Sequence, residues 1–308
     1  MLTFVNAKIN IGLSVVERRA DGYHLLNTCF YPVGIHNGTP HNPEPFGDIL
    51  ELTTGHLPVP EANAATGAVS SYDAAPFRFI FTGNRIDCPP EKNLVVRAAQ
   101  SFRSATGCDL PLTISMRKMI PDGAGLGGGS ADATFTLRML NRHTGSPLTD
   151  TQLEELALRL GADCPVFVKN QPTFAEGIGE IFSPIDSDSI RSLSERPYWL
   201  ALVKPALHIS TREAFAGIHP HYPAIPLREA LRRPIEEWRG CVRNDFEESL
   251  FPLYPELPRL KESLYASGAL YASMTGSGAA LYGIFADREA ARAALSAAAA
   301  PYSALIRL

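Results

Sequence analysis

The sequence predicts an α+β protein of two domains, with residues 1–180 in a larger first domain and residues 181–308 in a smaller second one. Its 308 residues are about twice the length of a typical domain. Apolar residues recur with the period of strands in some segments and with the period of helices in others. A polar, serine-rich segment at 183–197 divides the two parts, and we expect it to be a surface loop.

Three segments of the first part have the alternating pattern of strands. In residues 8–16 apolar and polar side chains alternate, which is typical of a strand buried on one face. The apolar set is Ile9, Ile11, Leu13 and Val15, and the polar set is Lys8, Asn10 and Ser14. The same alternation predicts strands over 77–82 and 112–117. Lys8 and Asn10 therefore project from one face of one strand.

Helices are predicted between and after these strands. Residues 94–105 carry an apolar stripe that follows two prolines, which commonly precede a helix. Two further helices are expected at 131–143 and 151–160. The second of these has a capping box in which Thr149 and Gln152 are the partners.

The second part also mixes strands and helices. Its expected strands are 198–204, 278–285 and 303–308. An alanine-rich helix follows Asp287, which is a good N-cap residue. The segments 36–47 and 55–76 are rich in Pro, Gly, Asn and Ala and predict surface loops.

Composition and charge narrow the classes of function. The chain has 28 Lys and Arg residues against 32 Asp and Glu, so no basic surface for nucleic acid or acidic lipid is expected. Lys8 interrupts the apolar N-terminus, unlike a signal peptide, and no apolar run approaches the ~18 residues of a membrane span. The five cysteines are scattered without a C-x-x-C pair, as in reduced proteins. We expect a cytoplasmic protein whose partners are small molecules.

Residues 121–130, PDGAGLGGGS, form a glycine-rich run directly before a predicted helix. The spacing G-x-G-x-x-G is present, but a second helix follows where a dinucleotide fold needs a strand. The Gly-Lys-Ser/Thr of a Walker loop and the H-R-D and D-F-G of protein kinases do not occur. What remains is a set of free glycine amides at the positive end of a helix that starts near Ser130, which favours phosphate. The alternative is a flexible loop, which the cap-like Ser130 and Asp132 oppose.

Lys8 and Asp163 are the candidate catalytic residues, because phosphoryl transfer needs positioned cations and a carboxylate near the accepting hydroxyl. Asp163 follows Gly161 at a predicted helix end, and an apolar stretch at 164–168 that predicts a strand comes next. An ion pair between the two would keep the carboxylate ionised and ready to accept a proton. Each alone is more often part of a structural ion pair, but together with the loop they form a catalytic set.

These residues resemble the motifs of the GHMP kinase superfamily, whose members have a glycine-rich phosphate loop in place of a Walker motif. NAKINIGL at 6–13 is similar to the first family motif, PDGAGLGGGSADA at 121–133 to the phosphate loop, and MTGSGAALYGIF at 274–285 to the C-terminal glycine motif. RRADGYH at 18–24 and GADCPVF at 161–167 narrow the resemblance to members that take a cytidine-bearing substrate in non-mevalonate isoprenoid synthesis.

The resemblance implies a kinase that uses ATP and Mg2+ to phosphorylate the 2-hydroxyl of that substrate. It implies a ribosomal-S5-like first domain and a ferredoxin-like second one, with Lys8 and Asp163 as the catalytic pair. For ATP it implies Asn93, Pro121, Gly123, Ala124, Gly125, Leu126, Gly127, Gly128, Gly129 and Ser130, supported by Gly276, Ser277 and Gly278. For the substrate it implies Asn10, Tyr23, His24, Thr211 and Phe215, with the base held between Tyr23 and Phe215.

The sequence departs from the family pattern at three places. Asn6 stands where the first motif usually has proline, Ala131 replaces a second serine, and the loop at 34–47 is longer than is typical. The magnesium ligand is therefore unidentified. Two alternatives stay open. One is a superfamily kinase acting on mevalonate or homoserine, which RRADGYH opposes, and the other is an inactive nucleotide-binding relative, which Lys8 and Asp163 oppose. The sequence does not set an oligomeric state.

Overall fold

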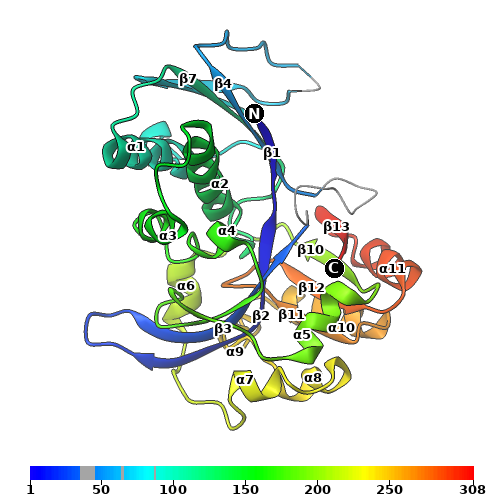
Figure 1. The fold of residues 1–308 in the computed structure, drawn as a ribbon. Coiled ribbons are helices and arrows are strands. Elements are labelled where there is room, and N and C mark those ends of the chain that lie inside the picture. The colour runs from blue at the N-terminus through cyan, green and yellow to red at the C-terminus, as the bar shows by residue number, and fades with distance from the viewer. Residues whose placement is uncertain (35–45, 64–65, 87) are drawn as a thin grey trace.

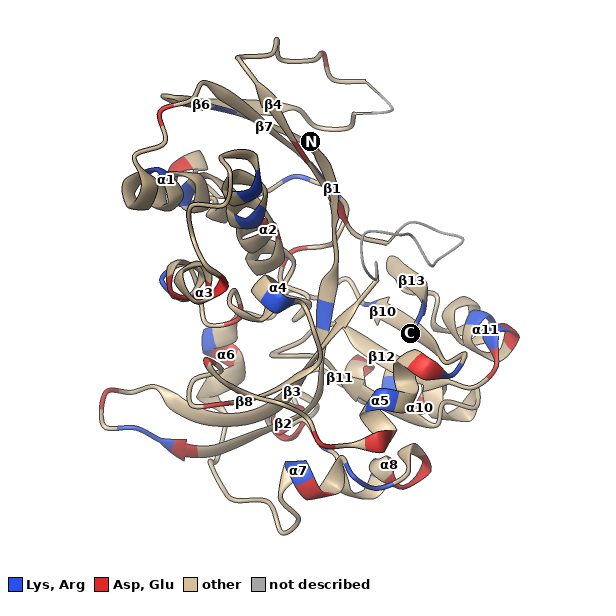
Figure 2. Cartoon of the chain, viewed as in Figure 1, with Lys and Arg blue, Asp and Glu red and all other residues tan. Residues whose placement is uncertain are grey.

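The computed structural model describes residues 1–34, 46–63, 66–86 and 88–308, which form three β-sheets with helices packed against them (Figure 1). The loop expected at 36–47 lies outside the described residues except for its last two. Among the described residues no helix is long and apolar enough to cross a membrane. Basic and acidic residues are interspersed along the elements in the view of Figure 2.

A five-stranded sheet forms the upper part of the molecule in Figure 1. Its strands, in spatial order, are β1 (Leu2–Val5), β4 (Asp48–Thr54), β7 (Leu112–Lys118), β6 (Phe77–Gly83) and β5 (Ser70–Ala74). Only the pair β6 and β7 is parallel. The helices α1 (Leu94–Thr106) and α2 (Gly128–His143) cover one face, where their apolar side chains share a core with the alternating phenylalanines of β6. The expected strands at 77–82 and 112–117 and the helix at 94–105 are confirmed.

A second, four-stranded antiparallel sheet connects the two halves of the chain. It consists of β2 (Ala7–Arg18), β3 (His24–Val33), β8 (Thr173–Glu176) and β9 (Ile181–Ser183), in that spatial order. Because β9 pairs with β8, this sheet continues to Ser183. The domain boundary after residue 180 stays a prediction.

The C-terminal sheet is antiparallel, and its spatial order is β11 (Tyr271–Met274), β12 (Leu281–Phe285), β10 (Trp199–Lys204) and β13 (Tyr302–Arg307). Numbered from β10 along the chain, the order is 2-3-1-4, read from the other edge as 4-1-3-2. With helices after β10 and β12, this is the β-α-β-β-α-β arrangement of a ferredoxin-like domain. The expected strands at 198–204, 278–285 and 303–308 are confirmed.

The remaining helices are short. They are η1 (Pro90–Lys92), α3 (Asp150–Leu158), α4 (Val166–Lys169), α5 (Asp188–Glu195), α6 (Thr211–Ala216), α7 (Leu227–Ala230), η2 (Ile235–Glu237), α8 (Trp238–Cys241), α9 (Phe246–Leu250), α10 (Glu256–Ala266) and α11 (Arg288–Ala298). The capping box of Thr149 and Gln152 at α3 and the Asp287 cap at α11 are both present, as the sequence predicts.

Two segments expected to be loops contain regular structure. Residues 188–195 form α5, capped by Ser187, because Ile190 and Leu193 lie one turn apart and are buried together. This apolar face consists of only two residues among many polar ones, so the sequence signal is weak. In the segment 55–76, β5 pairs with β6 through backbone hydrogen bonds that do not depend on side-chain polarity.

The burial of β2 also differs from the expectation. Every residue from Ala7 to Val16 is buried, so the polar face of this strand points into the protein and not into bulk solvent. The pairing of β2 with β3 shifts between Ile11 and Leu13, where Gly12 adopts a φ of 73°. Such a bulge changes which side chains share a face. Ile11 therefore packs in a different core cluster from Leu13.

Candidate active site

The glycine-rich loop ends in an N-terminus of α2 that no side chain caps. Gly127, with a φ of 66°, occupies the cap position, and the first backbone bond of the helix runs from the Ala131 N–H to the Gly127 carbonyl (2.8 Å). The helix starts at Gly128, earlier than the sequence suggested, because glycines can adopt the required geometry. The amides at the helix start are left for an anion, which the helix dipole also favours.

Two glycines of the loop lie where a side chain would collide with neighbouring groups. A Cβ on Gly125 would lie 2.0 Å from the carbonyl oxygen of Thr275, and one on Gly127 would lie 3.0 Å from Cε of Lys8. Both residues have positive φ angles, which glycine adopts most readily. The loop is therefore packed tightly between β2 and the turn after β11, which argues against the flexible-loop alternative.

A buried ionic cluster holds both ends of this loop. Nζ of Lys118 lies 2.6 Å from Asp48 and 2.7 Å from Asp132. The other oxygen of Asp48 accepts the N–H groups of Met119 and Ile120, where the loop begins, and Asp132 lies on α2, where the loop ends. Asp132 is therefore not a helix cap. Burial raises the pKa of Asp132 above its usual range.

Lys8 projects from β2 toward the loop and meets Asp163. Its Nζ lies 3.2 Å from Oδ2 of Asp163, donates to Oδ1 of Asn10 (2.6 Å) and donates to the carbonyl of Gly125 (3.1 Å). The side chain of Lys8 is only 3% exposed, whereas that of Asp163 is 36% exposed. The ammonium is thus fixed by three oxygens, and the carboxylate it pairs with stays accessible to a ligand.

Asp163 lies in a turn between α3 and α4. The strand expected over 164–168 is wrong, because Pro165 starts the single helical turn of α4 there. A short apolar run such as Val166–Phe167–Val168 is buried in either conformation, so its period does not decide between them. The hydroxyl of Thr134 on α2 donates to the Cys164 carbonyl (2.8 Å) and holds this turn beside the phosphate loop.

One cavity of about 720 Å³ brings the predicted residues together. Every residue proposed from the sequence lines it except Asn93: Lys8, Asn10, Tyr23, His24, Pro121, Gly123, Ala124, Gly125, Leu126, Gly127, Gly128, Gly129, Ser130, Asp163, Thr211, Phe215, Gly276, Ser277 and Gly278. Asn93 is 7% exposed, and its side chain caps α1 by accepting the N–H of Val95. The neighbouring Leu94 reaches the cavity instead.

Aromatic rings from β3, α6 and α9 also line the cavity, and we call this part its aromatic end. The rings of His24 and Phe215 are stacked with centroids 4.7 Å apart, and Phe246 meets Phe215 edge to face at 4.8 Å. Tyr23 lines the same end and is 61% exposed. Burial and the nearby positive charge of Arg18 lower the pKa of His24, so its ring is neutral near pH 7.

Asn10, which the resemblance assigns to the substrate, has its amide engaged within the protein, because it accepts from Lys8 and donates to the hydroxyl of Thr28 (2.9 Å). Thr275 and Arg212 are residues that the sequence reasoning missed. The hydroxyl of Thr275 accepts the N–H of Asn10 (3.0 Å) and donates to the Gly125 carbonyl (3.1 Å). Arg212 also lines the cavity, beside Thr211. Thr275 precedes the recognised Gly276, and this proximity was the only signal available.

Known proteins are similar to this chain over nearly its whole length. The family model for the GHMP kinase N-terminal domain matches residues 93–171, and that for the GHMP kinase C-terminal domain matches residues 227–304. The 4-diphosphocytidyl-2-C-methyl-D-erythritol kinase of Bacteroides fragilis (strain YCH46) is 46% identical over 94% of this chain and 93% of its own length.

Solved structures agree with this similarity. A crystal structure of a 4-(cytidine 5'-diphospho)-2C-methyl-D-erythritol kinase matches with a TM-score of 0.76 and 28% identity, covering 100% of this chain and 98% of that one. Methanococcus jannaschii mevalonate kinase covers 100% of this chain and 97% of its own with a TM-score of 0.66, but it is only 12% identical and shares the fold alone. Since both family models match in order and a relative is this similar throughout, the chain belongs to the GHMP kinases, ATP-dependent kinases of small molecules with a two-domain fold.

Proposed function

We propose that this enzyme transfers the γ-phosphoryl group of ATP to the 2-hydroxyl of 4-diphosphocytidyl-2-C-methyl-D-erythritol, a step of non-mevalonate isoprenoid synthesis in the cytoplasm. The main support for phosphoryl transfer is the Lys8–Asp163 ion pair beside the uncapped N-terminus of α2. The choice of substrate is supported by the relative that is 46% identical and by the aromatic end of the same cavity.

In the proposed reaction, the phosphates of ATP lie against the amides at the start of α2. Asp163 accepts the proton of the 2-hydroxyl while that oxygen bonds to the γ-phosphorus, and the bond from phosphorus to the bridging oxygen of ADP breaks. Lys8 orients Asp163 through their ion pair and faces the charge that develops on the transferring group. Asn10 and the Gly125 carbonyl fix the direction of the Lys8 ammonium, since both accept hydrogen bonds from it.

The cytidine of the substrate would occupy the aromatic end of the cavity. The stack of His24 on Phe215 leaves no room for a base between these two rings. We therefore assign the base to the position that His24 occupies against Phe215, with Tyr23 on its other face and the displaced, neutral His24 at its edge. Each stacking contact of this kind contributes about 1–3 kcal/mol. Arg212 supplies a positive charge for the diphosphate.

Magnesium is implied by the reaction. The described residues contain no group of three or more His, Cys, Asp or Glu that could hold a metal ion. This fits a cation bound mainly by the phosphates of ATP, because Mg2+ commonly uses only one or two protein oxygens in such sites. Ser130 and the partly exposed Asp163 line the cavity and offer those oxygens. When bound, the cation neutralises phosphate charge.

The test is a coupled ADP-release assay with four acceptors: the cytidyl substrate, methylerythritol phosphate without cytidine, mevalonate and homoserine. We expect turnover with the first alone, and mass spectrometry should place one added phosphate on it. Efficient turnover of the cytidine-free compound or of mevalonate would contradict the proposed substrate, although the enzyme would remain a kinase. No turnover with any acceptor, combined with tight ATP binding, would favour an inactive relative.

A further inference from the structure

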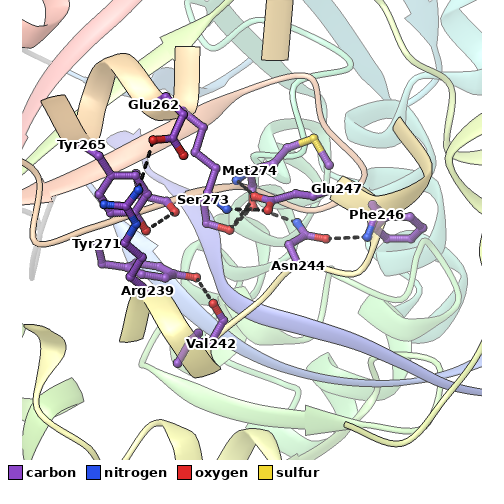
Figure 3. Close-up of polar contacts among 12 residues, drawn as sticks. Arg239, Val242, Asn244, Phe246, Glu247, Glu262, Tyr265, Tyr271, Ser273 and Met274 are labelled. Atoms are coloured by element: carbon purple, nitrogen blue, oxygen red, sulfur yellow. Dashed lines mark hydrogen bonds and ion pairs between the residues drawn. The ribbon is translucent and has the colours of Figure 1, made fainter. Parts of the chain in front are cut away.

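Asn244 is a buried amide outside the cavity whose hydrogen bonds reach both ends of the site. It is 1% exposed and lies in the segment Asn244–Glu247, which starts α9. Its Nδ2 donates to the carbonyls of Met274 (2.8 Å) and Gly276 (2.9 Å), and its Oδ1 accepts the N–H of Phe246 (3.1 Å). Figure 3 shows the amide between Met274 and Phe246.

The contacts of Asn244 on the Gly276 side lead to the phosphate loop. A Cβ on Gly276 would lie 3.0 Å from the Gly125 carbonyl, so the two backbones are in direct contact. The same carbonyl accepts from Lys8 and from Thr275. A shift of the turn at 276–278 would therefore move the surroundings of the Lys8 ammonium.

The contact on the Phe246 side leads to the substrate end. The Phe246 ring lines the cavity and packs edge to face on Phe215. Because Asn244 binds the Phe246 N–H, the amide sets where α9 begins and thus where this ring lies. The backbone on either side of Asn244 also pairs with Leu13 of β2, through Leu13 N–H to Arg243 (2.8 Å) and Asp245 N–H to Leu13 (2.8 Å).

The neighbouring Glu247 also binds β11 to the segment that starts α9. Its Oε1 accepts the N–H of Met274 (2.8 Å) and the hydroxyl of Ser273 (3.1 Å), and its Oε2 pairs with Lys261 (2.5 Å). The two polar backbone groups of Met274 are thus held by two side chains of one short segment, as Figure 3 shows. A connected and fully satisfied buried network of this kind fixes one conformation.

We propose that Asn244 is a positioning residue that fixes the turn at 276–278 and the Phe246 ring together, so that the phosphate end and the base end of the cavity keep their relative geometry. Asn244 itself does not line the cavity. The part of this inference that concerns the base rests on the proposed function, whereas the part that concerns ATP does not.

The experiment compares Asn244→Asp and Asn244→Ala with the matched control Asn141→Asp. Asn244→Asp keeps the acceptor for Phe246 but places a carboxylate against two carbonyls, whereas Asn244→Ala removes all three side-chain hydrogen bonds. Asn141 is a buried amide of the same kind, 7% exposed and bonded in both directions to Leu148 at the far end of α2. The ATP dissociation constant is measured by calorimetry, kcat and KM by ADP release, and folding by thermal unfolding.

We expect all three variants to lower the melting temperature. The two Asn244 variants should lose about tenfold to a hundredfold in kcat, because small misplacements of catalytic groups have effects of this size. Both should weaken ATP binding, and Asn244→Ala should additionally raise KM for the cytidyl substrate. Asn141→Asp should leave kcat, KM and the ATP dissociation constant unchanged.

Wild-type kinetic constants in a folded Asn244→Asp would overturn the proposal, and so would equal kinetic losses in Asn141→Asp. If Asn244→Asp does not fold, Asn244→Ser, which keeps one donor without a charge, is judged by the same criteria. A wild-type enzyme inactive on the cytidyl compound would refute the proposed function alone. The ATP dissociation constants would then still decide the role of Asn244.

Discussion

Replacing Lys8 with methionine tests the catalytic pair with little change in shape. The lysine stem lies in the core, and only its Nζ has polar partners, namely Asp163, Asn10 and Gly125. Methionine keeps most of the stem and removes the charge. The ammonium is 3% exposed and Asp163 is 36% exposed, so solvent and salt screen the pair only from the side of the carboxylate.

The expected loss of kcat in Lys8→Met is about 10²–10⁴-fold, the usual range for groups that assist proton transfer. This corresponds to about 2.7–5.4 kcal/mol in activation free energy, at 1.36 kcal/mol for each factor of ten. Oδ1 of Asn10 loses its Lys8 donor, at about 1–3 kcal/mol for a buried group left unsatisfied, whereas the Gly125 carbonyl keeps its hydrogen bond from the Thr275 hydroxyl. Removal of a buried charge offsets part of this cost, so the variant should fold.

The assay for Lys8→Met is ADP release under saturating substrates, with ATP binding and thermal unfolding measured on the same preparation. The control is Lys169→Met, because Lys169 is 64% exposed and forms only a surface pair with Glu154. Its kcat should stay within about twofold of wild type because Lys169 does not line the cavity, and its stability should change by at most about 1 kcal/mol. A folded Lys8→Met enzyme with kcat within about tenfold of wild type would remove Lys8 from the mechanism proposed above.

Further variants test other parts of the site. Gly127→Val should weaken ATP binding and also lower kcat, because its Cβ would press on the lysine stem at 3.0 Å; an unchanged ATP dissociation constant by calorimetry would place the nucleotide elsewhere. Phe215→Ala should raise KM for the cytidyl substrate about tenfold or more while KM for ATP stays constant. Arg212→Ala should raise the same KM, and this effect should diminish at high salt; a salt-independent KM would argue against diphosphate binding. Burial raises the folded pKa of Asp132 above its usual value of 3.8, so between 3.8 and the folded pKa the folded state binds more protons than the unfolded state. The free energy of unfolding should then fall as pH rises through this window, and Asp132→Asn should have a flatter profile in urea unfolding.

The sequence by itself determined the parts of the fold that depend on neighbouring residues. Period-two alternation identified β6 and β7, and helical spacing with a capping box identified α3. These signals are local, because side-chain direction and helix capping depend on residues a few positions apart. The glycine-rich run was recognisable from its composition, because positive φ angles such as those of Gly125 and Gly127 favour glycine.

Local signals were weakest where burial came from distant segments. The helix α5 buries only Ile190 and Leu193, and the apolar run of α4 fits a strand as well as a helix, so packing decided both. The bulge at Gly12 places Ile11 and Leu13 in different cores, which strict alternation cannot anticipate.

The catalytic geometry itself was decided by the tertiary structure. Lys8 and Asp163 belong to a strand and a turn far apart in the sequence, and packing brings their charged atoms to 3.2 Å. Backbone and side-chain bonds of Lys8 hold the loop on β2, and Thr134 holds the turn on α2. Asn244 belongs to none of the motifs recognised in the sequence. Only the structure shows that its amide forms hydrogen bonds with three backbone groups. A sequence shows which side chains are available, but hydrogen bonds between distant segments depend on the positions that the packed cores give to the backbone.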